Sequence, residues 1–138
     1  MENNSIFIEK LRSSGLRPTK QRIRICKLLF DRNKTFHFTI NDLSKILQKE
    51  NSKQISVATI YNTINSFKKK GYLKEISVNK DKIYFDTNTS DHHHFLDINT
   101  NELIDLKKEY VDKIRIKKNL PGKKINSIEV LVKIENSN

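Results

Sequence analysis

The stretch "ISVATIYNTINSFKKKGYLKEISVNKDKIYFD", residues 55–86, decides the fold of this chain. Its first half predicts a helix with Ser56 as the N-terminal cap and Gly71 at the C-terminal end. Two short runs of strand-forming residues follow, on either side of a polar turn, and they predict a hairpin. The helix is expected to bury the apolar residues that recur at steps of three and four, which are Val57, Ile60, Ile64 and Phe67.

Three shorter helices are expected upstream. The first ends at Gly15, because helices commonly end at a glycine with a left-handed backbone. Thr19 caps the second helix, and Thr39 forms a capping-box-like pair with Asp42 at the start of the third. Helices of this kind followed by a hairpin, all within residues 1–85, predict a winged helix-turn-helix domain.

The rest of the chain predicts a small α/β domain of three strands and one helix. Short runs of alternating apolar residues are typical of strands, and the segment between the second and third runs predicts a helix that ends before Pro121. The expected fold class is therefore α+β, with an N-terminal winged helix-turn-helix domain at residues 1–85 and a small α/β dimerisation domain at residues 86–138. The strands are expected at 92–98, 102–106 and 125–134, and the helix at 107–120.

Charge is distributed unevenly between these two parts. Residues 1–85 carry 18 Lys and Arg against 7 Asp and Glu, whereas residues 86–138 carry 9 of each. A cationic module joined to a neutral one predicts polyanion binding, and charge alone leaves duplex DNA, RNA and a membrane surface open. Because the sequence has no apolar run of membrane-spanning length and no signal-peptide pattern at its start, we expect a cytoplasmic protein that does not enter a membrane.

The single cysteine, Cys26, excludes an internal disulfide and any cysteine-rich zinc site. It lies in an apolar run, where a free cysteine is expected to pack inside the protein. The sequence shows no nucleophile signature, no glycine-rich phosphate loop and no pair of catalytic acids. We therefore expect a protein that is not an enzyme.

The face of the main helix opposite its apolar stripe is small and polar at its start and cationic at its end. Small polar side chains can approach base edges in a major groove, where asparagine suits adenine and a tyrosine ring or alanine methyl suits thymine. A solvated helix face is the alternative, but the adjoining helix, the hairpin and the local charge favour nucleic acid. The expected DNA-binding residues are Arg17, Lys20, Arg22, Ser56, Ala58, Thr59, Tyr61, Asn62, Asn65, Lys69, Lys80 and Lys82.

Three of the four histidines are consecutive, at 92–94. On a strand, His92 and His94 point to one face and His93 to the other. Two imidazoles on one face can hold a divalent ion with help from nearby carboxylates, and such ligands suit Fe(II), Mn(II) or Zn(II). A solvated histidine tract is the alternative, and His37 is either a further ligand or a packing residue.

Four motifs occur in the order and spacing of the ferric uptake regulator (Fur) superfamily of bacterial metal-responsive repressors, which the chain resembles from about residue 10 to 134. The resemblance implies a winged-helix domain that binds double-stranded operator DNA and a C-terminal domain that forms a homodimer. The motifs are "GLRPTKQR" (15–22), "HFTINDLS" (37–44), "ISVATIYNTINSFKKKGYLKEI" (55–76) and "HHHFLDINTNELIDL" (92–106).

By position, the resemblance implies roles for individual residues. Thr59, Tyr61 and Asn62 lie where the recognition helix of the family meets DNA, and Arg17 lies where a basic side chain reaches the minor groove. The positions of the metal ligands between the two domains are His37, Asp86, His92 and His94.

The resemblance also bears on two further metal sites. A second site of the family would use His93 and Asp112, although Ser127 stands roughly where a histidine is needed. Asp97 and Thr100 replace the first cysteine pair of relatives that carry structural zinc, so a four-cysteine zinc site is excluded.

The triple histidine and the missing cysteine pairs resemble the iron response regulator (Irr) subgroup, which senses iron through haem. The Cys-Pro haem motif of some members is absent, because Lys27 follows Cys26. We therefore expect a dimeric regulator of iron and haem homeostasis genes, governed by haem or a divalent metal (Fe, Mn or Zn) at a histidine-rich hinge. The alternatives are a Mn(II)- or Zn(II)-gated repressor without haem, and a haem- or metal-buffering protein with incidental DNA affinity.

Overall fold

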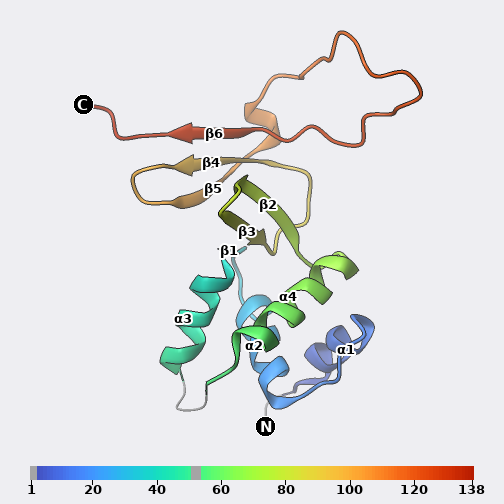
Figure 1. Ribbon diagram of the computed structural model, residues 1–138, viewed down its shortest axis with the longest axis vertical. Helices are drawn as coiled ribbons and strands as arrows, with labels where there is room; N and C mark the ends of the chain where they lie inside the picture. Colours follow the sequence, from blue (N-terminus) through green and yellow to red (C-terminus); the bar gives the residue numbers. More distant parts are fainter. Residues whose placement is uncertain (1–2, 51–53) are drawn as a thin grey trace. The chain divides into compact units, whose positions relative to one another are not determined.

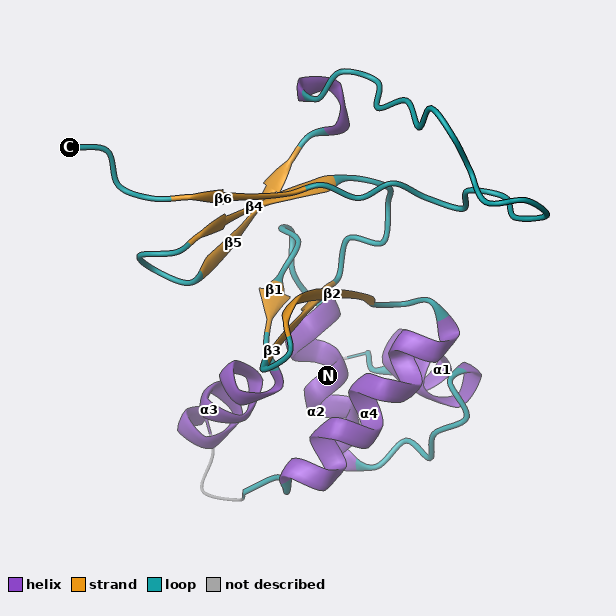
Figure 2. Ribbon diagram, turned by 45° about the horizontal axis from the view of Figure 1, so that its top comes forward, coloured by secondary structure: helices purple, strands orange, loops and turns teal. Residues whose placement is uncertain are grey.

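The computed structural model describes residues 3–50 and 54–138 and divides the chain into two compact units, Met1–Thr89 and Ser90–Asn138. The first unit combines helices with a small sheet, and the second is built on a separate sheet (Figure 1; Figure 2). The boundary expected after residue 85 falls within a strand of the first unit. Among the described residues, no helix has the length and apolar character that crossing a membrane requires.

The helices of the first unit begin and end at the residues that the sequence predicts. Thr19 accepts a hydrogen bond from the backbone N–H of Arg22, and Thr39 and Asp42 each accept one from the other's backbone N–H. Gly71 closes the longest helix with a φ of 92°, a left-handed conformation that favours glycine. The helices are α1 (Ser5–Ser13), α2 (Lys20–Phe30), α3 (Ile40–Glu50) and α4 (Val57–Lys70).

The sheet of the first unit contains the expected hairpin and one strand more. Strands β2 (Lys74–Asn79) and β3 (Lys82–Asp86) form the hairpin, and β1 (His37–Phe38) pairs antiparallel with β3, so the strand order is β1-β3-β2. With only two residues, β1 is too short for its alternation to be recognised in the sequence. Together with α3 and α4, the hairpin completes a winged helix-turn-helix.

The core of the first unit comes from all four helices and the sheet. Phe67 on α4 lies edge-to-face against Phe30 on α2, with ring centroids 5.4 Å apart, and Arg24 of α2 donates to the carbonyl oxygen of Leu47 near the end of α3, at 2.6 Å. One prediction for α4 is wrong: Val57 is 60% exposed, and Thr63 is fully buried instead. The fully buried apolar residues include Leu11, Ile25, Leu29, Phe38, Leu43, Ile60, Ile64 and Phe67.

Thr63 can be buried because its hydroxyl does not remain unpaired. The Thr63 Oγ1 donates to the carbonyl oxygen of Thr59 at 2.7 Å, within the same helix. A buried hydroxyl without such a partner would cost free energy of folding. A threonine can therefore be buried at position 63. The apolar pattern alone instead predicts burial of Val57, nearly two turns earlier in the helix.

Cys26 packs in the core, as expected, and is fully buried. Its Sγ lies 3.9 Å from the carbonyl oxygen of Phe7 on α1. Burial raises the pKa of the Cys26 thiol to about 11, although the charge of Lys10 acts in the opposite direction. The thiol is therefore protonated at neutral pH, and only the thiolate is a good nucleophile.

Alkylation of Cys26 by iodoacetamide is expected to be very slow in the native protein. At a pH of about 8, a thiol with this pKa is ionised to roughly one part in a thousand. We expect native protein to react at least about a hundred times more slowly than protein unfolded in guanidinium, as followed by intact-mass spectrometry. Similar rates in the two states would contradict the buried position of the thiol.

The second unit contains the three expected strands. Strand β4 (His93–Asp97) pairs antiparallel with β5 (Glu102–Leu106) and parallel with β6 (Leu131–Ile134), so the order is β5-β4-β6. The β4–β5 turn is held by Asp97, whose Oδ1 accepts the backbone N–H of Asn99 at 2.9 Å. These contacts fix the register of β5 against β4.

The prediction of a helix at residues 107–120 is wrong. Only a single 3₁₀ turn, η1 (Lys108–Tyr110), forms there, and the chain then runs without regular structure to β6. Most of the stability of a helix in a protein comes from burying one apolar face. Here Ile114 and Ile116 are separated by one cation, which is not a helical spacing, and they remain 39% and 52% exposed.

Strand β6 is shorter than expected and is held at both ends. At its start, the backbone N–H of Val130 donates to Nδ1 of His93 at 3.0 Å. Beyond its end, the backbone N–H of Asn136 donates to Oδ1 of Asn99 at 2.7 Å. Side chains of β4 and of the following turn therefore accept backbone N–H groups on either side of β6, where the strand pairing has ended.

Candidate metal centre and nucleic-acid interface

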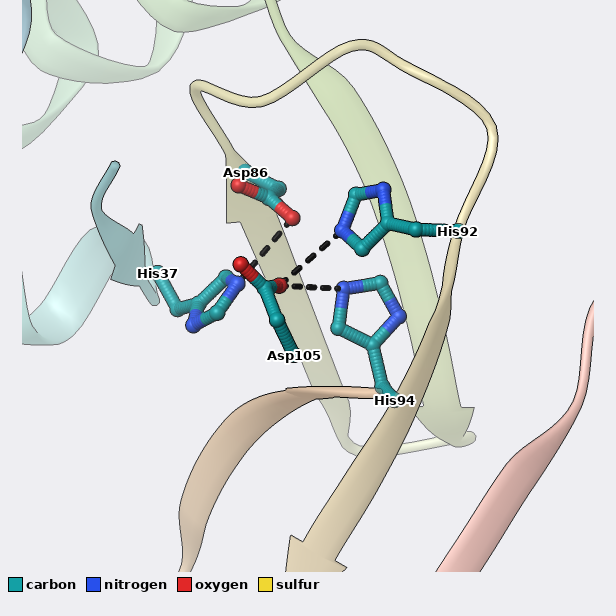
Figure 3. Close-up of side chains that lie close together, drawn as sticks. All are labelled: His37, Asp86, His92, His94 and Asp105. Atoms are coloured by element: carbon teal, nitrogen blue, oxygen red, sulfur yellow. Dashed lines mark hydrogen bonds and ion pairs between the residues drawn. The ribbon is translucent and has the colours of Figure 1, made fainter. Parts of the chain in front are cut away.

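The first unit holds a histidine–aspartate pair whose aspartate is fully buried. The register of β1 and β3 places His37 directly opposite Asp86, and His37 Nε2 lies 3.0 Å from Asp86 Oδ2 (Figure 3). The Asp86 side chain is fully buried, and its Oδ1 accepts the backbone N–H of Asn88 at 2.8 Å. A buried carboxylate requires such partners.

The second unit holds two histidines that meet one carboxylate. Asp105 on β5 lies opposite His94 on β4, and its Oδ1 is 3.4 Å from His94 Nε2 and 3.0 Å from His92 Nε2 (Figure 3). The two imidazole rings are 4.4 Å apart between centroids. Both histidines are buried, at 7% and 4% exposure, whereas the Asp105 side chain is 33% exposed.

The contact between His92 and Asp105 is compatible with a bound cation. His92 Nδ1 lies 2.7 Å from the carbonyl oxygen of Ser90 and donates its hydrogen there, so a neutral His92 has only a lone pair at Nε2. That lone pair faces a carboxylate oxygen. Such a contact is favourable only when a proton or a metal ion lies between the two atoms, and the backbone contact at Nδ1 is the usual support of a metal-binding histidine.

The chemistry of these ligands fits a divalent transition metal. Two imidazoles and one carboxylate, without a thiolate, suit Fe(II), Mn(II) or Zn(II), and two histidines with one carboxylate are the usual set of non-haem Fe(II). One ligand atom each from His92, His94 and Asp105 lies within 4.8 Å of the others. The His37–Asp86 pair offers a further imidazole and carboxylate of the same type.

Asp105 is absent from the ligands expected from the sequence, although a signal for it exists. The turn between β4 and β5 fixes which residues face each other, and counting outward from that turn pairs Asp105 with His94. Sequence spacing alone gives no reason to prefer Asp105 to the other acids nearby. The ladder of the hairpin supplies that reason.

His93 lies on the other face of β4 and is engaged differently. Its Nδ1 accepts the backbone N–H of Val130, so in the neutral imidazole Nε2 carries the hydrogen and has no lone pair for a metal. The expected partner of His93, Asp112, is exposed. Both residues line a cavity of about 420 Å³. The cavity is lined by Asp91, His92, His93, Lys108, Val111, Asp112, Lys113, Ile114 and Ile128.

The N-terminal half of α4 presents an exposed face of mixed character. Tyr61 is 55% exposed, Ala58 and Asn62 are exposed, and Val57 joins them as an apolar residue that the sequence prediction assigned to the core. Valine, alanine and tyrosine can contact thymine methyl groups, and asparagine can bind adenine. Further along the helix Lys69 is exposed, and Asn65 is half-buried.

One of the expected DNA-binding residues, Ser56, also caps α4 by bonding to another, Thr59. Ser56 Oγ accepts the backbone N–H of Thr59 at 3.1 Å, and the two hydroxyl oxygens lie 2.9 Å apart. Losing such a cap costs about 1 kcal/mol of stability. A substitution at Ser56 therefore affects the helix before it affects any ligand.

Some of the expected basic residues of the first unit are exposed, and others contact neighbouring groups of the protein. Arg17 and Lys20 precede or begin α2 and are exposed, and Lys80 is exposed in the turn between β2 and β3. Arg22 donates to the carbonyl oxygen of Arg17 at 3.1 Å, and Lys82 Nζ lies 5.9 Å from the ring centre of Tyr84. The exposed three are the better placed to reach phosphates.

Comparison with known proteins decides the family. The sequence pattern of the Ferric uptake regulator family matches residues 13–133. The chain belongs to the ferric uptake regulator family. Members of this family are transcription regulators that bind operator DNA as dimers, and they are not enzymes.

Two curated relatives of this ferric uptake regulator family protein are peroxide regulators. The "Peroxide operon regulator" of Bacillus subtilis (strain 168) is 33% identical over 107 residues, which cover 78% of this chain and 72% of the relative. The "Peroxide-responsive repressor PerR" of Staphylococcus epidermidis is 32% identical over 107 residues, which cover 78% and 69%. These similarities do not confirm the membership in the Irr subgroup that the sequence predicted.

Solved structures of the family share the fold. The ferric uptake regulator of Pseudomonas aeruginosa, solved with manganese, has a TM-score of 0.65 at 19% identity and covers 96% of this chain and 99% of its own. That of Vibrio cholerae has a TM-score of 0.69 at 18% identity and covers 94% and 98%. The α+β fold class with an N-terminal winged helix is thereby confirmed.

Asp105→Asn is expected to weaken the binding of a divalent ion by at least tenfold, since even partners that only orient metal ligands contribute about 10- to 100-fold. The asparagine keeps the shape of the side chain and removes its charge. Competition with a chromogenic chelator for Mn(II) or Zn(II) would measure the affinity. Asp112→Asn is the matched control, and equal losses in the two variants would show that Asp105 is not a ligand.

Proposed function

We propose that this chain is a dimeric, sequence-specific DNA-binding regulator whose affinity for its operator depends on a bound divalent metal ion. The observation that carries the proposal is the convergence of two buried imidazoles, His92 and His94, on the carboxylate of Asp105. The membership in a family of transcription regulators supplies the function that such an ion can govern. A regulator of this kind acts in the cytoplasm, on chromosomal DNA.

One ion is proposed to bind ligands from both units. His37 and Asp86 would join His92, His94 and Asp105 around it. An ion that needs all of these ligands favours one orientation of the winged helix relative to the dimer. The two recognition helices of a dimer must enter major grooves about 34 Å apart, so a change of orientation alters DNA affinity.

The ion acts by preferring one arrangement of the protein. Each tenfold change in the ratio of the two arrangements requires about 1.4 kcal/mol of preferential binding. Iron, manganese and zinc are the candidates that the ligand types allow. Solved relatives are described with manganese, with iron and as zinc-bound, which supports the same choice of ions.

The DNA-binding surface is proposed to combine base contacts with phosphate contacts. Val57, Ala58, Tyr61 and Asn62 on α4 would read the major groove, with Thr59 beside them and Asn65 further along. Arg17, Lys20, Lys69 and Lys80 would neutralise phosphates, with Arg22 and Lys82 as weaker contributors. Base contacts specify sequence, whereas phosphate contacts set position and salt dependence.

Haem is the second candidate, in a regulator of iron and haem genes like those of the Irr subgroup. The run of three histidines beside a cavity of about 420 Å³ favours it. The hydrogen bonding of the histidines disfavours it, because Nε2 of His92 and of His94 faces Asp105 and Nδ1 of His93 accepts a backbone N–H. As arranged here, these residues fit a small ion better than a haem iron.

A response to peroxide is a third possibility, which rests on the names of the two curated relatives. A peroxide response would use the same metal site, but it requires a redox-active ion such as Fe(II) at the ligands described above. The sensing chemistry would then add to the DNA binding rather than replace it.

The test measures DNA affinity with and without metal. A duplex selected from a random pool by Mn(II)-loaded protein serves as the operator. We expect Mn(II) to raise the affinity of the wild type by at least about tenfold over EDTA-treated protein, which corresponds to 1.4 kcal/mol, and to have no effect on the His92→Ala/His94→Ala variant. His93→Asn is the matched control, because its amide oxygen can accept the Val130 N–H.

Further outcomes separate the candidates. If haemin rather than Mn(II) changes the affinity, and His93→Asn abolishes the effect, the haem-responsive regulator is correct. If hydrogen peroxide releases DNA only from Fe(II)-loaded protein, the peroxide response is correct. If the protein binds metal but does not prefer the selected duplex to random DNA at physiological salt, it is a metal-buffering protein and the proposed function is wrong.

A further inference from the structure

Residues 86–138 have no net charge, but their positive and negative charges are unevenly distributed along the chain. Of their nine Lys and Arg, six lie within residues 113–128, and none of their nine Asp and Glu does. The remaining residues of 86–138 therefore have three cations against nine acids. We refer to residues 113–128 as the basic arm, and its cations are Lys113, Arg115, Lys117, Lys118, Lys123 and Lys124.

The basic arm is an exposed loop between η1 and β6. It has no helix or strand, all six of its cations are exposed, and both ribbon views show it extending away from the sheet of its own unit (Figure 1; Figure 2). A limb of about eight residues can reach roughly 26–29 Å when fully extended. The cations can therefore contact a partner well away from the sheet.

The tip of the basic arm is an ordered turn. The backbone N–H of Lys123 donates to the carbonyl oxygen of Leu120 at 3.2 Å, and the Asn119 side-chain amide donates to the carbonyl oxygen of Lys123 at 2.9 Å. Gly122 completes the turn with a φ of 72°. This turn places Lys117 and Lys118 on one limb and Lys123 and Lys124 on the other, so that four charges flank one tip.

We propose that the basic arm is a second DNA-binding element, which contacts the phosphates of a duplex independently of the winged helix. The inference goes beyond the surface proposed above and rests on the proposal that duplex DNA is the partner. Short segments rich in Lys and Arg are typical of patches that interact with nucleic acid, and residues 113–118 hold four of the six cations of the arm. Contacts to phosphates carry no sequence information, so an arm that binds through them adds affinity without adding sequence preference.

Duplex DNA fits the basic arm better than a membrane surface does. Binding in a membrane interface requires an amphipathic helix with its apolar residues on one face. The arm is not helical, and its exposed apolar residues, among them Ile116 and Leu120, are scattered between cations along the chain. An irregular cationic segment can instead follow a phosphate backbone, whose charges are closely spaced along its length.

The salt dependence of DNA binding tests the proposal. The logarithm of the association constant falls with the logarithm of salt concentration, with a slope of about −0.9 per phosphate contact. Replacing Lys117, Lys118, Lys123 and Lys124 with Gln is therefore expected to make the slope shallower by about 2 to 3.6, which corresponds to two to four lost contacts. The assay uses full-length protein and a random-sequence duplex, so it does not depend on an operator or on bound metal.

Two control variants complete the experiment. Replacing Lys34, Lys107, Lys108 and Lys133 with Gln removes the same number of exposed charges outside the basic arm and should leave the slope within about one unit. Replacing the four lysines of the tip with Arg keeps the charge and should keep the slope of the wild type. Circular dichroism and analytical ultracentrifugation check the fold and the oligomeric state of each variant.

Equal changes of slope in the two Gln variants would overturn the proposal, because net charge alone would then explain the effect. An unchanged slope in the tip variant would also overturn it. If that variant instead loses binding to vesicles that contain phosphatidylserine, the arm is a membrane contact, and if it changes only self-association, the arm is a dimer contact. Failure of metal control over operator binding would leave this result unaffected, so the two proposals fail separately.

Discussion

The convergence of two buried imidazoles on one carboxylate is the constraint on which the functional account depends. His92 donates through Nδ1 to a backbone carbonyl, so its Nε2 faces Asp105 with a lone pair, and His94 meets the same oxygen. Two acceptors at this distance repel each other unless a cation lies between them. Two buried imidazoles therefore meet a carboxylate that is 33% exposed, and a divalent metal ion could supply the positive charge between them.

Alternation along β4 and the residue before it places the three consecutive histidines on two faces. His92 and His94 face the carboxylate, whereas His93 faces the other way and accepts the N–H of Val130 at the start of β6. The three histidines therefore have two different environments. One face holds the candidate metal ligands, and on the other His93 fixes the start of the four-residue edge strand β6.

Residues with local signals were predictable, and residues that depend on distant partners were not. The caps at Thr19, Thr39 and Ser56 act within their own helices, so the sequence identifies the helix starts correctly. The two-residue strand β1 exists only because β3 pairs with it, and Asp105 becomes a ligand candidate only through the register of β5 against β4. The helix expected at 107–120 is missing because its apolar residues find no surface to cover in the described chain, and the exposed Val57 shows that a regular apolar step does not guarantee burial.

The proposed regulator binds one metal ion through imidazole rings. X-ray absorption at the metal edge of Zn(II)-loaded protein tests this proposal directly, because multiple scattering from imidazole rings counts the histidine ligands. We expect nitrogen and oxygen ligands only, with rings from His37, His92 and His94, and the loss of one ring in His37→Ala and of another in His92→Ala. A spectrum that His37→Ala leaves unchanged, or one that contains a sulfur ligand, would contradict it.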